Sequence, residues 1–229
     1  CLNGGNPEKP DVYGGFKGIV DGLAEMCADL STPVVGGNVS LYNDSEAGPI
    51  PPTPTLAMVG TKAGYDAPPA ALSGEGELLL VGDAGDALGG SEYLNAVGGS
   101  DAFPELPENP ADLVATIAEV ARDETTLATH DVSHGGLAVT LAELLTADAG
   151  ADVAVDDVVA LFDETPGRVV VETTDPERVR AAFDGVAAVQ SIGEATADGE
   201  LSLTVGDETV ELGAEVVAEL RDVIPETLE

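Results

Sequence analysis

The sequence predicts a mixed α/β (α+β) fold, and three observations lead to that class. Segments with apolar residues at helical spacing alternate with short, continuous apolar runs that are typical of buried strands. Hydrophobic residues make up 44% of the 229 residues and charged residues 22%, a composition that can bury a sizeable core. Clusters of glycine and proline separate the segments and mark the loops between them.

The N-terminal part is predicted to contain one helix and two buried strands. After a loop over the first ten residues, a helix is expected over 11–30, with one apolar face made of Phe16, Ile19, Val20, Leu23, Cys27 and Leu30. A buried strand over 33–35 follows, and then the loop GGNVS. A proline-rich connection leads to a second buried strand over 55–62. A linker ends near Ser73, so we expect domains over 1–73 and 74–229.

The C-terminal domain is predicted to alternate strands and helices. Its expected strands lie at 77–81, 168–172, 188–192 and 201–205, the last paired in a hairpin with 208–212. Its expected helices lie at 109–123, 137–147, 155–162, 176–183 and 214–222, with apolar residues such as Leu113, Ile117, Val120, Leu141 and Leu144 facing inward. A glycine-rich loop with a short helix occupies 82–99.

The charge balance is far from neutral. Asp and Glu number 43 against eight Lys and Arg, for a formal net charge of −35. Such a chain has no basic face for nucleic acid or for an anionic membrane. Because self-repulsion of this size is screened by salt, the composition favours a protein from a salt-rich cytoplasm over a mildly acidic mesophilic one.

Cysteines and apolar runs exclude further classes. Cys1 and Cys27 are the only cysteines, too few and too far apart for a disulfide framework or a zinc site. Cys27 is expected to be buried within its helix. The sequence shows neither a signal peptide nor an apolar run long enough to span a membrane, so a cytoplasmic location is expected. The opening Cys-Leu-Asn, without Met, suggests a piece of a longer chain.

The GGNVS loop is the first candidate site. Gly36 and Gly37 would let backbone N–H groups approach a phosphate. The Asn38 side-chain oxygen could bind a hard cation such as Mg²⁺, and the Ser40 hydroxyl could contact a substrate. An irregular strand with a glycine bulge explains the same residues equally well.

The segment THDVSHGG is the second candidate site. Its two glycines open a predicted helix, whose N-terminus could bind an anion, and Asp131 could hold a cation between phosphates. Alternatively, Asp131 or Ser133 simply caps that helix. His130 and His134 have no visible nucleophile partner and are predicted not to be catalytic. Taken alone, Glu164 and Thr165 in DETPGR occupy a turn. The chain contains no P-loop and no G-x-G-x-x-G motif.

Four segments resemble the large subunit of phosphoribosylformylglycinamidine synthase: CLNGGNPEKPDVYGGFKGIVDGLAEMCADLSTPVVGGNVSLYND, PIPPTPTLAMVG, LGGSEYL and THDVSHGGLAVTLAEL. They follow the family's order and span nearly the whole chain. The resemblance implies an aminoimidazole ribonucleotide synthetase-like architecture, with part of the second A domain over 1–73 and the whole second B domain over 74–229. It also implies an ATP-dependent ligase of purine biosynthesis, which converts formylglycinamide ribonucleotide and ammonia to formylglycinamidine ribonucleotide.

The resemblance also implies cofactors, partners and site residues. ATP and Mg²⁺ are the cofactors, and the partners are the missing N-terminal half of the polypeptide, a glutaminase subunit and a small accessory subunit. Gly37 matches a nucleotide contact, Asn38 a Mg²⁺ ligand and Ser40 a substrate contact. The family's catalytic histidine lies in the missing half, so no catalytic residue is expected here. By internal symmetry, an auxiliary nucleotide pocket would involve Asp131, Gly135, Gly136 and Glu164.

Departures from the family pattern keep two alternatives open. Gly4 replaces a usual aromatic residue, while His134 and Pro166 stand where the pattern has a small residue and Gln. The last two suggest that the second-half pocket is not a working substrate site. The supplied piece could therefore be a non-catalytic module for nucleotide binding and domain contacts. Another member of the aminoimidazole ribonucleotide synthetase superfamily is the second alternative, which CLNGGNPEKP and GGNVSLYN disfavour.

Overall fold

The computed structural model describes residues 1–64, 69–83 and 85–221. The chain divides into two compact units, Cys1–Tyr65 and Asp66–Glu229, each described here by itself. Parts of three predicted segments lie outside the described residues: 65–68 of the linker, residue 84 of the glycine-rich loop and Asp222 at the end of the last helix.

The N-terminal unit is built on one long helix and a short sheet. Helix α1 (Pro10–Asp29) confirms the predicted helix and begins with a proline, whose fixed φ suits the first helical turn. Strand β1 (Leu2–Asn3) lies between β2 (Val39–Ser40), which is parallel to it, and β5 (Thr53–Pro54), which is antiparallel. A two-stranded hairpin of β3 (Asp44–Ser45) and β4 (Gly48–Pro49) completes the unit.

The two buried strands predicted in this unit are wrong. Residues 33–35 and 55–62 form no strand, and their apolar side chains are exposed, Val35 to 95% and Val59 to 101%. The sequence signal was apolar character, which indicates burial only where a neighbouring strand is present to pair. The prediction that Cys27 is buried is also wrong: it is only partly buried, like the rest of the apolar face of α1, which contains no fully buried residue.

The C-terminal unit is organised around a seven-stranded mixed sheet. The strands follow the order β12-β11-β8-β10-β6-β9-β7, in which only β11 and β8 pair in parallel. Their bounds are Glu77–Val81 (β6), Thr126–Asp131 (β7), Gly150–Val155 (β8), Val169–Thr173 (β9), Val189–Thr196 (β10), Glu200–Val205 (β11) and Glu208–Gly213 (β12).

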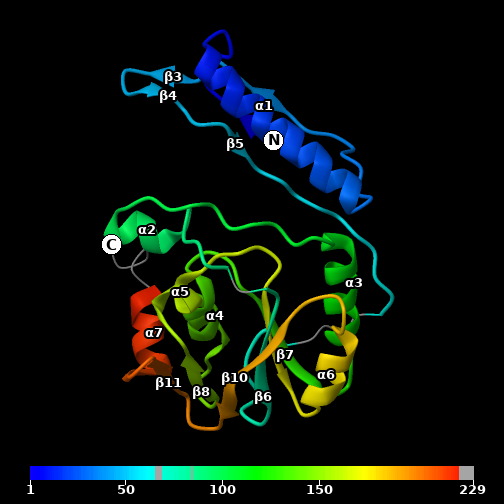
Figure 1. Cartoon of the computed structure of the whole chain (residues 1–229), viewed down its shortest axis with the longest axis vertical. Coiled ribbons are helices and arrows are strands. Elements are labelled where there is room, and N and C mark those ends of the chain that lie inside the picture. Colours follow the sequence, from blue (N-terminus) through cyan, green and yellow to red (C-terminus); the bar gives the residue numbers. More distant parts are fainter. Residues whose placement is uncertain (65–68, 84, 222–229) are drawn as a thin grey trace. The chain divides into compact units, whose positions relative to one another are not determined.

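Helices cover both faces of this sheet (Figure 1). They are α2 (Glu92–Val97), α3 (Pro110–Val120), α4 (Gly136–Leu144), α5 (Val158–Phe162), α6 (Pro176–Ala182) and α7 (Ala214–Arg221). Leu78 and Leu80 of β6 pack on the face with α4 and α5, whereas Leu79 and Val81 pack on the face with α3 and α6. Because alternate side chains of β6 are buried on opposite faces, its sequence after Glu77 is the unbroken apolar run LLLV.

One strand was missed and one predicted helix is too long. Residues 150–155 form β8, and α5 begins only at Val158, so the helix predicted over 155–162 loses its first turn. Asp157 explains the start, because its side chain caps the helix by accepting a hydrogen bond from the N–H of Ala160 at 2.9 Å. The segment GADVAV contains Gly, Asp and two Ala, so its apolar signal is weak, although it forms a strand whose exposed residues are Asp152 and Ala154.

The predicted domain boundary after residue 73 stays a proposal. The residues just before it pack on the C-terminal unit: Leu72 is buried in the core, and its N–H donates to the Leu144 carbonyl at 2.9 Å. The backbone N–H groups of residues 73–76 and the Ser73 hydroxyl all donate to the buried carboxylate of Glu172, at 2.6–3.1 Å. Glu172 therefore fixes the chain where it enters the unit.

Candidate functional site

The GGNVS loop is an open backbone segment held at one end. A Cβ added to Gly36 or Gly37 would have no atom within 4 Å, so both glycines face open space. The loop becomes fixed where it meets β1, because the Asn38 carbonyl accepts the N–H of Leu2 at 2.9 Å and the Ser40 carbonyl accepts that of Gly4 at 2.9 Å. Its backbone N–H groups before Asn38 are thus placed for close approach of a ligand.

Asn43 is a positioning residue that sequence reasoning missed. Its side-chain amide nitrogen lies within hydrogen-bonding distance of three acceptors: the Gly4 carbonyl at 3.1 Å, the Ser40 carbonyl at 3.0 Å and the Ser40 hydroxyl at 3.2 Å. This side chain ties the end of the loop to the segment that follows β1 and orients the Ser40 hydroxyl. The only sequence signal was an amide three residues after a candidate substrate contact.

The Asn38 side chain has a single oxygen that a cation could bind. Mg²⁺ prefers octahedral oxygen coordination, usually with carboxylates, waters and ligand phosphates. Among the residues that the structure describes, no group of three or more His, Cys, Asp or Glu side chains could hold a metal ion. Asn38 therefore fits a Mg²⁺ site only as one ligand, with the remaining donors coming from elsewhere.

The residues predicted for the auxiliary pocket meet only in part. Gly135, the N-cap of α4, has a left-handed backbone with φ of 82°, and its N–H donates to Glu164 Oε1 at 2.8 Å. The N–H of Glu92, at the start of α2, donates to the same oxygen at 2.8 Å. Gly136 packs against the backbone of residues 161–162, where a Cβ would come within 2.8 Å. The Glu164 carboxylate thus joins two loops.

Asp131 lies beside this cluster rather than at the helix N-terminus. One of its carboxylate oxygens accepts the Ser133 hydroxyl at 2.5 Å, and its backbone carbonyl accepts the Thr140 hydroxyl at 2.9 Å. The alternative in which Asp131 or Ser133 caps the helix is wrong, because the N-cap is Gly135 and makes no side-chain capping bond.

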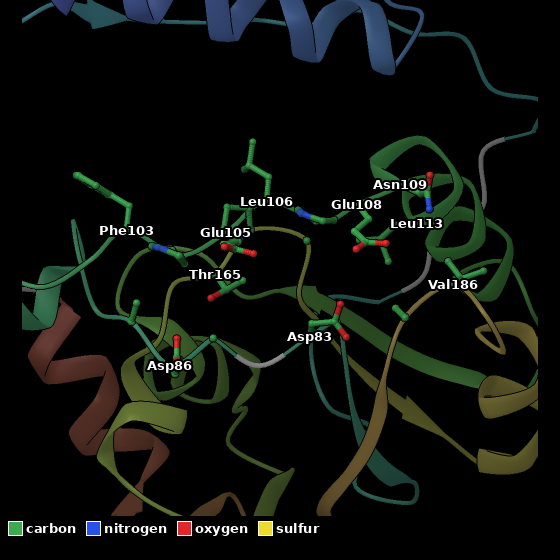
Figure 2. Close-up of a pocket in the computed structure, with 18 of the residues that line it drawn as sticks. Asp83, Asp86, Phe103, Glu105, Leu106, Glu108, Asn109, Leu113, Thr165 and Val186 are labelled. Atoms are coloured by element: carbon green, nitrogen blue, oxygen red, sulfur yellow. The ribbon is translucent and has the colours of Figure 1, made fainter.

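A cavity of the C-terminal unit lies next to these residues and is lined by others. It measures about 500 Å³, within the range of small-molecule sites. Figure 2 shows the segment with Phe103, Glu105, Leu106 and Glu108 along one side and Asp83 and Asp86 opposite. Thr165 and Pro166 of the DETPGR motif line it, but the four predicted pocket residues do not. Among the described residues, no Lys, Arg or His lines it.

A buried ion pair supports the wall of this cavity. Arg168 Nη1 donates to Asp163 Oδ2 at 2.8 Å, and both side chains are almost wholly buried. Asp163 also accepts the N–H of Gly85 at 2.9 Å and that of Thr165 at 2.8 Å, so one carboxylate joins both cavity-lining loops. Burial lowers the pKa of Arg168, against the raising effect of Asp163. The DETPGR motif alone did not predict this ion pair.

Both histidines lie beside carboxylates. His130 Nδ1 lies 2.8 Å from the Asp131 carbonyl, and its Nε2 lies 3.5 Å from Glu143. His134 is 87% exposed, and its Nδ1 is 3.8 Å from Glu92. That the two histidines are not catalytic stays a prediction. No helix in the described part of the chain is both long and apolar enough to cross a membrane.

Two family domains match the chain in order. Residues 1–61 match the N-terminal domain of the AIR synthase related proteins, and residues 74–206 match the C-terminal domain. The chain is 66% identical over its whole length to the phosphoribosylformylglycinamidine synthase subunit PurL of Natronomonas pharaonis and 56% identical to that of Halobacterium salinarum. It spans about a third of the length of these curated relatives, 33% and 32%.

Solved structures share the fold at low identity. PurL of T. maritima complexed with FGAR superposes with a TM-score of 0.67 over 95% of this chain and 38% of that one, at 17% identity. The hydrogenase maturation protein HypE of E. coli gives a TM-score of 0.61 over 93% of this chain and 72% of that one, also at 17% identity. With both domain types matched, this chain belongs to the family of AIR synthase related proteins.

Proposed function

We propose that the chain is part of an ATP-dependent carbon–nitrogen ligase of purine biosynthesis. The parent enzyme would convert formylglycinamide ribonucleotide and ammonia, derived from glutamine, to formylglycinamidine ribonucleotide, ADP and phosphate. The amide oxygen of the substrate would take the terminal phosphoryl group of ATP. Ammonia would then form the new carbon–nitrogen bond as phosphate leaves.

One observation carries the proposal: the chain is 66% identical to a PurL subunit over its entire length. The N-terminal and C-terminal family domains also follow each other in the expected order. The FGAR and ATP complexes of T. maritima PurL share its fold. The relatives from Natronomonas pharaonis and Halobacterium salinarum come from salt-loving archaea, which agrees with the net charge of −35.

Three residues of the GGNVS loop would contact the ligands. Gly37 would bring its backbone against the nucleotide, Asn38 would give one oxygen to Mg²⁺, and Ser40 would donate its hydroxyl to the substrate. Their support is geometric: both glycines are open, and Asn43 holds the Ser40 hydroxyl in place. When bound, Mg²⁺ would offset the negative charge on the transferring phosphoryl group.

The C-terminal unit would hold an auxiliary nucleotide around Asp131, Gly135, Gly136 and Glu164. A helix N-terminus favours anions, and α4 begins at Gly136. The N–H of Gly135 already donates to Glu164, so a phosphate there would have to displace that carboxylate or bind with it through a cation. This auxiliary role is separable from catalysis.

The remaining partners would be the rest of the same polypeptide, a glutaminase subunit that supplies ammonia, and a small accessory subunit, all in the cytoplasm. A T. maritima PurLQS assembly shares the fold of this chain. The low burial in the N-terminal unit supports a covering partner, because its described residues bury only one apolar side chain, Leu2.

Steady-state kinetics on the full-length enzyme tests these roles. We expect Asn38→Ala to lower the Mg²⁺-dependent rate by at least tenfold and to shift the Mg²⁺ requirement upward. His134→Ala, a change at an exposed side chain, should leave both unchanged and serves as the control. Equal losses in the two variants would count against the assignment of Asn38.

The second candidate function is a non-catalytic module, favoured by the departures at His134 and Pro166 and by the short donor set. The 229-residue chain with ATP, Mg²⁺, ammonia and substrate should make no product, because it provides only one wall of the proposed site. Product formation by the pure chain would overturn this account of where the chemistry occurs.

A further inference from the structure

The acceptors around Asn43 determine which way its side-chain amide points. The nitrogen Nδ2 lies 3.1 Å from the Gly4 carbonyl and 3.0 Å from the Ser40 carbonyl. Carbonyl oxygens only accept hydrogen bonds, so the NH₂ group must face them, because the flipped amide would set Oδ1 against both oxygens. Two backbone carbonyls therefore set the orientation of the Asn43 amide.

The same NH₂ group also serves the Ser40 hydroxyl. Nδ2 lies 3.2 Å from Ser40 Oγ, and its two hydrogens are shared among three acceptors, so none is left over for a ligand. Oγ accepts from Nδ2 and keeps its own hydrogen. That hydrogen can reach Asn43 Oδ1 at 3.4 Å, which is long for an O–H donor. A ligand oxygen at about 2.7 Å from Oγ is the better partner for it.

A left-handed turn brings Asn43 to this position. Tyr42 has a φ of 63°, a conformation that is disfavoured for a residue with a Cβ. The Tyr42 N–H donates to the Gly5 carbonyl at 3.1 Å. The Asn43 N–H donates to the Gly4 carbonyl, also at 3.1 Å. The main chain thus holds the Asn43 side chain against Ser40.

We propose that Asn43 is a specificity-determining positioning residue, which makes the Ser40 hydroxyl a hydrogen-bond donor to the substrate. The substrate atom at Ser40 is then an oxygen that only accepts, in a carbonyl or a phosphate group. A substrate N–H would compete with Nδ2 for Oγ and would leave the hydroxyl hydrogen with its long contact to Oδ1. This inference rests on the proposed function in one respect, that Ser40 contacts the substrate.

Steady-state kinetics of the full-length enzyme, with formylglycinamide ribonucleotide and ATP varied in turn, tests this role. Asn43→Asp keeps the size of the side chain but turns the donor into an acceptor, which draws the Ser40 hydrogen away from the substrate. We expect the KM for the ribonucleotide to rise roughly tenfold or more, and the KM for ATP to stay nearly unchanged. Ser40→Ala should give a similar rise. Because Asn43 acts through Ser40, the double variant should exceed Ser40→Ala by less than about twofold.

Asn6→Asp is the matched control. It adds the same charge to the same unit, but Asn6 Oδ1 already accepts the N–H of Glu8 at 2.8 Å, so that hydrogen bond survives and both KM values should stay unchanged. Asn43→Ala removes the donor without adding charge, and it carries the test if the Asp variant fails to fold. It should raise the KM for the ribonucleotide roughly threefold.

Four results would overturn the proposal. An unchanged ribonucleotide KM in both Asn43 variants, beside a rise in Ser40→Ala, would remove Asn43 from recognition and leave the substrate contact of Ser40 intact. An equal rise in both KM values would give Asn43 a general structural role. Effects that multiply in the double variant would show that the two side chains act separately. Unchanged kinetics in Ser40→Ala would contradict the substrate contact itself, and with it that part of the proposed function.

Discussion

The two units differ in how much of their own apolar and charged surface they bury. The C-terminal unit buries two apolar clusters on opposite faces of its sheet, together with a charged pair and a carboxylate that accepts five hydrogen bonds. In the N-terminal unit, the described residues bury one apolar side chain, Leu2, and α1 buries none. The described residues of the first unit therefore leave most of its apolar side chains uncovered, whereas those of the second unit form two buried clusters.

The two units also differ in net charge, and the unit with the larger buried core carries most of the negative charge. Residues 1–65 carry seven acidic and three basic side chains, a net charge of −4, whereas residues 66–229 carry 36 and five, a net charge of −31. Self-repulsion therefore acts mainly on the unit with the complete core. Stability of that unit depends on packing and on salt together.

The largest expected effect is the loss of the C-terminal unit at low salt. Because salt screens repulsion among its carboxylates, cooperative unfolding should move to higher temperature from low to multimolar KCl. Circular dichroism during thermal unfolding measures this. Sodium sulfate at equal ionic strength separates screening from preferential exclusion. A transition that stays flat or falls with KCl would contradict the salt-adapted interpretation.

The next largest effect concerns the ion pairs of the two units. Asp163→Ala leaves Arg168 buried without its carboxylate and should destabilise the protein by about 3–5 kcal/mol in denaturant unfolding. Replacing both residues, Asp163→Leu with Arg168→Met, should recover most of that loss. In the N-terminal unit, Asp44→Ala removes the exposed pair with Lys9 and should have no measurable effect on the main transition.

Glu172 offers a sharper test of how the chain enters the C-terminal unit. Glu172→Gln keeps the shape but replaces one accepting oxygen by a donor, facing the N–H groups of residues 73–76. The cost should be roughly 3 kcal/mol, since a buried charged acceptor is lost. Glu75→Gln, at an exposed neighbour, is the control. Equal stabilities for the two variants would remove Glu172 from its anchoring role.

The smallest effect is a pH dependence at the loop beside the cavity. Hydrogen bonds from the N–H groups of Leu88 and Ala102 lower the pKa of Asp101. A lowered pKa stabilises the fold at neutral pH, and the contribution disappears as pH falls through the folded pKa. Asp101→Asn should therefore reduce the melting temperature at pH 7 but not at a pH below that pKa. Glu108→Gln, on the cavity that this loop borders, controls for general charge removal.

The sequence predicted the C-terminal unit better than the N-terminal one for a physical reason. Apolar runs such as 77–81 and 168–172 predicted strands whose partners are present, and β6 and β9 form there. The runs at 33–35 and 55–62 carry the same signal but stay exposed, because pairing is a property of the neighbouring strand. An apolar run shows that a segment can be buried in a sheet, but its burial depends on whether neighbouring strands are present.

Site prediction had a similar limit. Glycines and an amide in GGNVS pointed to an open loop, and the structure has one. Asn43 and Asp163 were missed because folding brings them to distant partners, Gly4 and Gly85. Arg168 is close in sequence to its partner Asp163, but its burial with that carboxylate depends on the rest of the fold. Local motifs do not encode such contacts. The cavity likewise arises from four separate segments, which no single stretch of sequence reveals.

Site-resolved hydrogen exchange of the whole chain in multimolar KCl is the most direct test of the central claim. We predict that amides of β6 and β9 exchange only through global unfolding of the C-terminal unit. Amides of α1 should exchange through local opening at a free energy several kcal/mol lower, because its apolar face is only partly covered. Equal protection of α1 and β6, lost in one cooperative transition, would contradict the account.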